Sequence, residues 1–146
     1  ATLFVVFLGL HPFPDPASLD CRDGGARALL RPFGFLDAYV TFWRSGRPLE
    51  IWLRSMSILA PAMNVVFFAG VGLALARETR SFALALAFAL ALTLFIELAQ
   101  LTGLFGIYPC PYRHFEVDDL ILNVTGVLLG FAVGRSRFRR GPRPAR

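Results

Sequence analysis

Lysine is absent from this chain of 146 residues, and histidine and cysteine occur only twice each. All fifteen basic residues are therefore arginine. The sequence also lacks the Ser/His/Asp order of a hydrolase triad, a His-x-x-x-His pair and a glycine-rich phosphate loop. These absences argue against a hydrolase, a histidine-based metal enzyme and a nucleotide-dependent enzyme, and we expect no cofactor.

Long apolar runs are what the sequence does contain. Hydrophobic residues make up 55% of the chain, and its mean hydropathy is +0.57. A membrane-spanning helix needs roughly 20 apolar residues in succession. Residues 56–76 and 81–101 meet that length, and residues 119–134 come close to it. The sequence therefore predicts an integral α-helical membrane protein.

The first residues, 1–10, are also apolar, but they cover only about half of a bilayer at ~1.5 Å per residue. The proline-rich sequence that follows ends this helix. We interpret residues 1–10 as the end of a truncated first span rather than the remnant of a signal peptide, because neither a basic start nor a cleavage site is recognisable. We therefore expect one domain over residues 1–146, an all-α integral membrane protein folded as a four-helix transmembrane bundle.

The positions of the arginines predict the orientation in the membrane. Arg77 and Arg80 lie between the second and third spans, and six arginines lie in the basic tail, residues 135–146. Because basic loops stay in the cytoplasm, both segments are predicted to be cytoplasmic. This placement explains the net charge of +5 better than nucleic-acid binding does. The loop 100–117 and the segment 11–55 are then on the outer face.

Two features stand out on the predicted outer face. Cys21 and Cys110 both fall there, where an oxidising compartment permits a disulfide, and two unrelated thiols are the alternative. Residues 29–43 are rich in aromatic side chains, which is typical of an interfacial segment on the membrane surface between spans 1 and 2. Its aromatic residues are Phe33, Phe35, Tyr39, Phe42 and Trp43.

Polar residues recur at helical spacing inside the apolar runs. Glu97 and Gln100 are three residues apart and share one helix face, and Asn64 lies about 12 Å below the Met56 end of the second span. A second stripe steps by four, three, four and four through Asp119, Asn123, Gly126, Gly130 and Gly134. We expect the two stripes to face each other, with Arg113 above them in the loop. All these polar side chains fall in the outer halves of their spans.

The glycines of the second stripe form a helix-packing motif. Gly126, Gly130 and Gly134 are spaced by four residues, and small residues at this spacing let membrane helices approach closely. We therefore expect the closest helix contact here, with the second or third span.

These residues resemble the signature of the VanZ-like membrane proteins. The match is Glu97-x-x-Gln100 followed by Arg113-x-Phe115-x-x-Asp118-Asp119-x-x-x-Asn123-x-x-Gly126-x-x-x-Gly130. The stretch from Asn64 to Gly72 is similar to a second family motif, with Gly70 where the family usually has proline. The resemblance implies a four-span protein of the bacterial inner membrane. Members of the family are linked to low-level resistance to teicoplanin-type glycopeptide antibiotics, without an established chemical activity.

The polar cluster has two interpretations that the sequence leaves open. In the first it serves packing: Asp118 is the N-cap of the last helix, Asn64 and Asn123 bond between helices, and Arg113 pairs with Asp118 or Asp119. In the second it is an outward-facing binding site, which the following residues would line: Asn64, Glu97, Gln100, Arg113, Asp118, Asp119 and Asn123.

In the site interpretation, Arg113 contacts an anionic head group while Glu97 and Asp119 accept hydrogen bonds from hydroxyls or amines. Asn64 and Asn123 hold the carboxylates from below. A phospholipid, a lipid-linked envelope precursor or a glycopeptide suits such a site.

An enzymatic use of the same residues is weakly supported. Glu97 and Asp119 as an acid/base pair, or His114, Glu116 and Asp118 as metal ligands, have no further motif behind them. His114 beside aromatic residues is more typical of the membrane interface than of a ligand. We therefore expect no metal, and the protein is more consistent with a non-enzymatic function. An accessory subunit packed on a larger membrane complex remains the alternative.

The orientation is testable by labelling. A Ser136→Cys variant with both native cysteines replaced should react with a membrane-impermeant thiol reagent only after the cells are permeabilised, because residue 136 is predicted to be cytoplasmic. Labelling in intact cells would overturn the predicted orientation.

Overall fold

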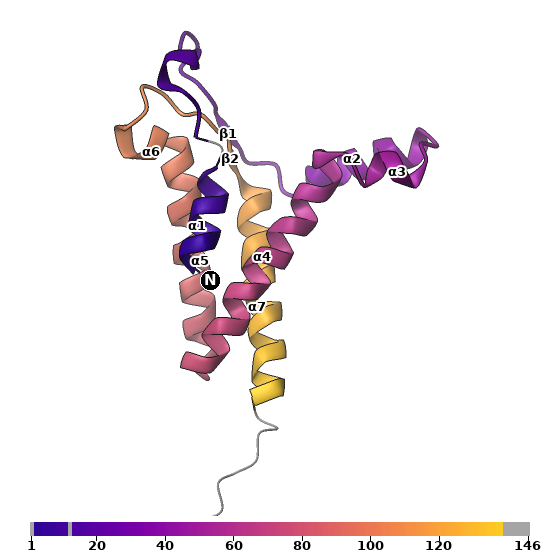
Figure 1. Ribbon diagram of the computed structural model, residues 1–146, viewed down its shortest axis with the longest axis vertical. Coiled ribbons are helices and arrows are strands. Elements are labelled where there is room, and N and C mark those ends of the chain that lie inside the picture. Colours follow the sequence, from indigo (N-terminus) through magenta and orange to yellow (C-terminus); the bar gives the residue numbers. More distant parts are fainter. Residues whose placement is uncertain (1, 12, 139–146) are drawn as a thin grey trace, which may run out of the picture.

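The computed structural model describes residues 2–11 and 13–138, so residues 139–146 of the predicted basic tail lie outside the described part. Most of the described chain is helical (Figure 1). Three helices are long and apolar enough to cross a membrane, namely α4 (Met56–Glu78), α5 (Phe82–Leu101) and α7 (Val117–Phe138). In Figure 1, α4 and α7 run downward and α5 runs upward. The chain is therefore a membrane protein by the length and composition of these helices.

The observed helices extend beyond the predicted apolar runs at charged ends. Helix α4 ends two residues later than predicted, at Glu78, and α7 extends four residues further, to Phe138. The apolar runs did not include these turns, because the turns contain the polar residues Arg77, Arg135 and Arg137. Polar residues can nevertheless continue a helix. Helix α5 begins at Phe82 because the Ser81 side chain caps it, accepting a hydrogen bond from Leu84 N–H at 3.3 Å.

Helices α4 and α7 pack along most of their lengths through small residues. A Cβ atom added at Gly126 would lie 2.5 Å from the carbonyl oxygen of Val65, and one at Gly134 would lie 2.6 Å from Cβ of Ala76. A Cβ at Gly130 would collide with the backbone of Ala69. The glycine stripe thus lies against the second span, and Gly72 of α4 lies equally close to the backbone of α7.

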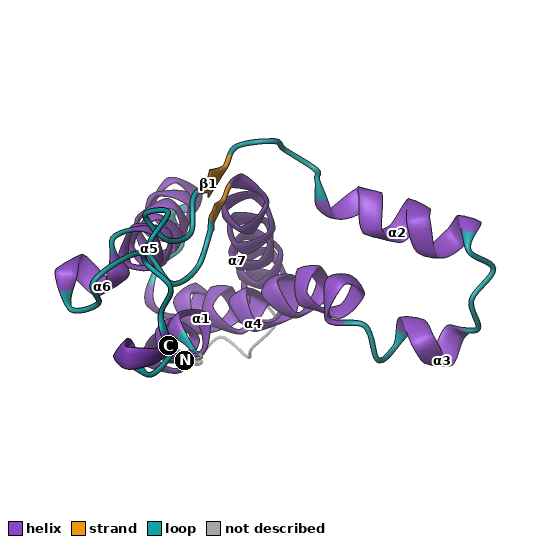
Figure 2. Cartoon of the chain, turned by 90° about the horizontal axis from the view of Figure 1, so that it is seen from above, coloured by secondary structure: helices purple, strands orange, loops and turns teal. Residues whose placement is uncertain are grey.

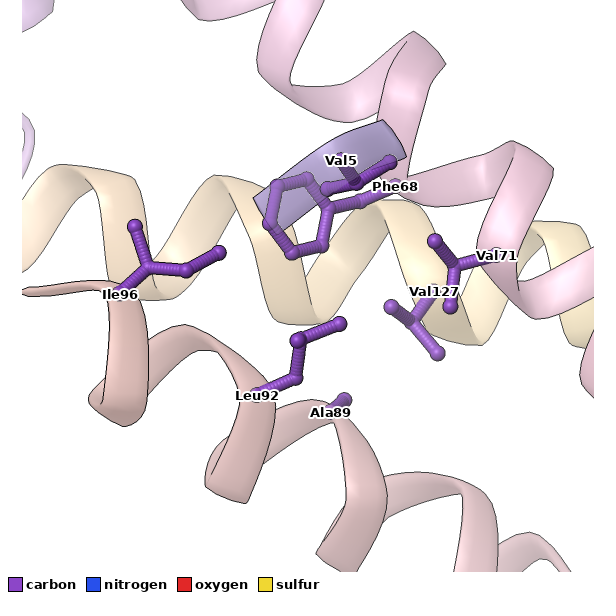
Figure 3. Close-up of a cluster of buried hydrophobic side chains, with 7 residues drawn as sticks. All are labelled: Val5, Phe68, Val71, Ala89, Leu92, Ile96 and Val127. Atoms are coloured by element: carbon purple, nitrogen blue, oxygen red, sulfur yellow. The ribbon is translucent and has the colours of Figure 1, made fainter. Parts of the chain in front are cut away.

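Helix α1 (Thr2–Leu10) lies between α4 and α5 (Figures 1 and 2). Its Gly9 comes close to α5, since an added Cβ would lie 3.1 Å from Ile96 Cγ2. Val5 of α1 joins an apolar core that the other three helices complete (Figure 3). The members of this core are Val5, Phe68, Val71, Ala89, Leu92, Ile96 and Val127. The described part of the chain thus contains three span-length helices and the nine-residue α1.

Two connecting segments meet above α1 and are tied together. Cys21 and Cys110 form a disulfide across 89 residues of sequence. The two-residue strands β1 (Ala28–Leu29) and β2 (Phe115–Glu116) pair in parallel next to it, and the short helices η1 (Pro16–Ser18) and α6 (Gly103–Gly106) belong to the same segments. We call this the disulfide end of the molecule, and we call the end with Arg77, Arg80 and Arg135 the arginine end. None of these short elements was predicted, because elements of two to four residues are too short to leave a periodic pattern.

The predicted interfacial segment forms an arm that leaves the bundle sideways at the disulfide end (Figures 1 and 2). It consists of α2 (Phe35–Arg44), a turn and α3 (Leu49–Trp52). Within the arm the Phe42 and Trp52 rings pack edge to face, 5.6 Å apart. Trp43, in contrast, is 80% exposed.

A matched pair of glycine substitutions tests the α4–α7 contact. Gly130→Ala should lower the free energy of unfolding in detergent by about 1–3 kcal/mol, because the new methyl group pushes the α4 backbone away. Gly70→Ala is the control: Gly70 is also helical, but an added Cβ meets nothing within 4 Å. It should leave stability unchanged or raise it by up to about 1 kcal/mol through helix propensity. Equal effects in thermal melts of the two variants would contradict the contact.

Candidate functional site

A cavity of about 510 Å³ lies among α1, α4, α5 and α7 at the disulfide end. Six of the seven predicted polar residues line it, namely Asn64, Glu97, Gln100, Arg113, Asp119 and Asn123. Apolar side chains complete the wall, and Val5, Phe68 and Ile96 join it to the core shown in Figure 3. The two polar stripes therefore face each other across a cavity with Arg113 beside them.

Glu97 is the most deeply buried charged group of the cavity. Its residue is only 1% exposed, and its Oε2 accepts a hydrogen bond from the Glu116 backbone N–H at 2.9 Å. That bond fixes strand β2 above the end of α5. Oε1 has no hydrogen-bond partner among the described residues, so this carboxylate retains acceptor capacity on the cavity side.

Asp119 lies across the cavity on α7 and is tied to α4. Its Oδ1 accepts a hydrogen bond from Asn64 Nδ2 at 2.6 Å. This bond spans the contact between the two helices, about two turns above Gly126. Asn64 therefore orients this carboxylate and also bonds one helix to another, which both interpretations of the polar cluster expected.

Three side chains from other segments donate hydrogen bonds to the carbonyl groups at the end of α1. Gln100 Nε2 and Arg113 Nη1 both donate to the Gly9 carbonyl, at 2.6 and 3.1 Å. Arg113 Nη1 also reaches the His11 carbonyl at 3.1 Å, and the Tyr112 hydroxyl donates to the Leu10 carbonyl at 2.9 Å. The last carbonyls of a helix have no partners within it, and its C-terminal dipole favours a cation.

These contacts correct one prediction and add a residue. Arg113 does not form an ion pair with Asp118 or Asp119: its hydrogen bonds in the described chain go to the end of α1 through Nη1. No pattern in the sequence points to Tyr112. Burial raises the pKa of the Tyr112 phenol, so the hydroxyl is even less ready to lose the proton that it donates.

Two acceptor oxygens inside the site are left without donors. Asn123 Nδ2 donates to the Thr93 hydroxyl at 3.0 Å, so the prediction that Asn123 supports a carboxylate is wrong. Asn123 Oδ1 and Gln100 Oε1 are buried and accept no hydrogen bond within the described residues, although both residues line the cavity. A buried acceptor without a donor costs about 1–3 kcal/mol. A ligand in the cavity that carries hydrogen-bond donors could satisfy both oxygens.

The family model of VanZ/LLP1 matches residues 1–138. The chain belongs to the VanZ/LLP1 family. No curated protein and no solved structure matches it. The match confirms the resemblance seen in the sequence.

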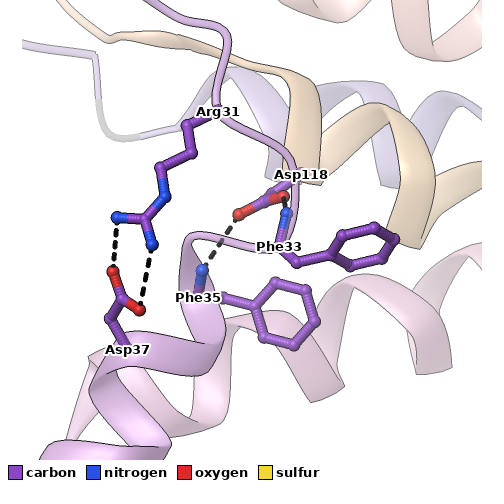
Figure 4. A network of polar contacts seen from close by, with 5 residues as sticks. All are labelled: Arg31, Phe33, Phe35, Asp37 and Asp118. Atoms are coloured by element: carbon purple, nitrogen blue, oxygen red, sulfur yellow. Dashed lines mark hydrogen bonds and ion pairs between the residues drawn. The ribbon is translucent and has the colours of Figure 1, made fainter.

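Of the seven residues predicted to line the site, Asp118 is the one that does not line the cavity. It lies inside the first turn of α7, so its prediction as the N-cap is wrong. Its carboxylate accepts hydrogen bonds from the backbone N–H groups of Phe33 and Phe35, the latter at 3.0 Å (Figure 4). Phe33 has a φ of 61°, which is uncommon for a residue with a side chain. Asp118 thus holds the start of the arm in a strained turn.

Metal ligation finds no support in the described geometry. No group of three or more His, Cys, Asp or Glu residues in the ranges 2–11 and 13–138 could hold a metal ion. The His114 ring nitrogen Nδ1 lies 3.1 Å from the backbone nitrogen of Arg27 and 2.9 Å from its carbonyl oxygen. His114 therefore links the two segments at the disulfide end.

The role of Asp118 is testable by hydrogen exchange. Asp118→Ala should speed exchange of the Phe33 and Phe35 amides by roughly tenfold to a hundredfold, because hydrogen bonds to a charged group contribute about 1.5–3 kcal/mol. Asp37→Ala is the control, since Asp37 makes only an exposed ion pair with Arg31 at 2.7 Å (Figure 4). It should leave both amides unchanged. Equal exchange rates in the two variants would show that Asp118 does not hold the start of the arm.

Proposed function

We propose that this VanZ/LLP1 protein is non-enzymatic and binds the head group of an anionic envelope lipid in the cavity at the disulfide end. One observation carries the proposal: Gln100 Oε1 and Asn123 Oδ1 are buried acceptors without donors on the wall of this cavity. Buried polar groups in proteins are nearly always satisfied, so a ligand with donors is the natural complement of this wall.

The charges of the cavity suit a head group that has both an anion and donors. Glu97, Asp119 and the two unpaired amide oxygens favour hydroxyl or amine groups, as found on sugars and amino head groups. Arg113 uses Nη1 for the end of α1, while its Nη2 and Nε have no acceptor among the described residues. That edge of the guanidinium suits a phosphate or carboxylate.

The apolar part of the wall favours a lipid over a soluble ligand. Met56 and Met63 of α4 line the cavity and are 63% and 38% exposed, so they mark its side toward the surroundings. An acyl chain could lie along these flexible side chains while its head group enters between α1 and α4. A volume of about 510 Å³ fits a head group better than a complete glycopeptide with several residues and sugars.

The proposal includes a location and an orientation. The protein is placed in the bacterial inner membrane as a multi-pass protein with a cytoplasmic C-terminus and the disulfide end outside. The Cys21–Cys110 bond suits an oxidising compartment. Helix α1 would complete a four-helix bundle in the outer half of the membrane. The arm would lie on the membrane surface, where its exposed Trp43 suits the interface.

Conservative substitutions test the proposal. Glu97→Gln and Asp119→Asn keep size and most hydrogen bonding but remove the charges. The double variant should keep its detergent melting temperature and lose at least about tenfold of its lipid occupancy, measured by native mass spectrometry after gentle extraction, because each charge-assisted hydrogen bond contributes about 1.5–3 kcal/mol. It should also lose any effect on tolerance to envelope-directed antibiotics.

Glu50→Gln supplies the control, because Glu50 is exposed on α3, away from the cavity. It should keep the parent's lipid occupancy. If the double variant kept the parent's lipid occupancy, the lipid site would be contradicted. The polar cluster would then serve helix packing. If gentle extraction instead retains protein subunits and no lipid, the accessory-subunit alternative takes its place.

A further inference from the structure

A second cavity, of about 580 Å³, lies at the opposite, arginine end of the molecule. It shares no residue with the cavity at the disulfide end, and the function proposed above does not use it. Its wall comes from the ends of α4 and α7 and from the connection between α4 and α5. The residues that line it are Ala76, Arg77, Glu78, Thr79, Arg80, Arg135 and Phe138.

The charge of this cavity is strongly positive. Arg77, Arg80 and Arg135 come from three different parts of the chain, and Glu78 is the only acidic residue among those that line the cavity. The ion pairs found within the described residues are Arg22 with Asp20 and Arg31 with Asp37, so none involves these three arginines. Three arginines thus line one cavity, and none of them forms an ion pair within the described residues.

Aromatic rings set the position of two of these guanidinium groups. The guanidinium carbon of Arg77 lies 5.1 Å from the ring centre of Phe138, and that of Arg135 lies 5.9 Å from the ring centre of Phe131. An arginine next to an aromatic ring gains a cation–π interaction through its face. Its N–H groups point outward in the plane of the guanidinium, where they can grip an oxyanion in a bidentate fashion.

The backbone explains why a space opens at this point. Gly134 and Ala76 are the last small residues in the close contact between α4 and α7. Beyond them the helices carry Arg77, Arg135 and Phe138, which are too large for such an approach. Helix α4 then ends, because Thr79 is extended, and Arg80 follows in the short connection to α5. The space therefore forms at the membrane end of two span-length helices.

We propose that this cavity binds the phosphate group of an anionic phospholipid in the leaflet at the arginine end. The phosphate complements the three guanidinium groups, and the ends of the spans lie at the depth of lipid head groups. Ala76 and Phe138 supply an apolar surface for the adjoining part of the lipid. The site is thus a receptor for a lipid phosphodiester, separate from the acceptor-rich cavity at the other end.

Lipid titration of the purified full-length protein in detergent tests this proposal. Phosphatidylglycerol should bind more tightly than phosphatidylcholine, and Arg80→Gln combined with Arg135→Gln should weaken its binding by about tenfold for each arginine, because each would lose direct hydrogen bonds to the phosphate. Arg137→Gln is the matched control, because it removes the same charge from α7 at an exposed position that does not line the cavity. It should change the affinity less than twofold.

A second measurement uses the unaltered protein, so it does not depend on the variants folding. Phenylglyoxal modifies arginines, and mass spectrometry follows each one. Phosphatidylglycerol should slow modification of Arg77, Arg80 and Arg135 but not of Arg137, and phosphatidylcholine should protect none of them. Equal protection of Arg137, or equal binding of the two lipids, would overturn the proposal. Protection by millimolar inorganic phosphate without lipid would assign the cavity to a soluble phosphate and overturn the lipid assignment.

Discussion

Helices α4 and α7 lie backbone against backbone, and this contact sets the geometry of both ends of the molecule. Inside a membrane the hydrophobic effect does not drive helices together, so close van der Waals packing between small residues must do so. Gly126 and Gly130 on α7 and Gly72 on α4 provide it. The hydrogen bond from Asn64 to Asp119, at 2.6 Å, depends on this approach, and so does the place where the helices diverge beyond Gly134.

The polar residues at the disulfide end serve packing and leave capacity for a ligand at the same time. Three of them bind the backbone of a distant segment with part of their hydrogen-bonding capacity: Glu97 binds strand β2, and Gln100 and Arg113 bind the end of α1. Each retains a further donor or acceptor without a partner in the described chain. The two interpretations drawn from the sequence are therefore not exclusive, because backbone anchoring is what holds the remaining groups in position.

Features that repeat with the helical period could be predicted from the sequence, and features that depend on the path of loops could not. The spans and the contact of Gly126, Gly130 and Gly134 follow from spacing alone. Asp118 and Asp119 are neighbours, however, and consecutive helix residues point about 100° apart, so only one can face the cavity. The partner of Arg113 was mispredicted because the loop path depends on a disulfide across 89 residues and on the β1–β2 pairing. Helix α6 was missed because Leu104 and Phe105 adopt positive φ values that side chains disfavour.

The polar cluster ends part-way along the bundle. Among the described residues, Thr93 on α5 and Asn123 on α7 are the last buried polar side chains on the way from the disulfide end to the arginine end. Beyond them, Ala85, Val127 and Phe131 fill the interior at 0% exposure. A pathway across the membrane needs polar groups or water along its whole length, because an ion or polar solute in an apolar interior is costly. Between Thr93 and the arginine end the described interior is apolar instead, so the two cavities stay separate, as the two proposed binding sites require.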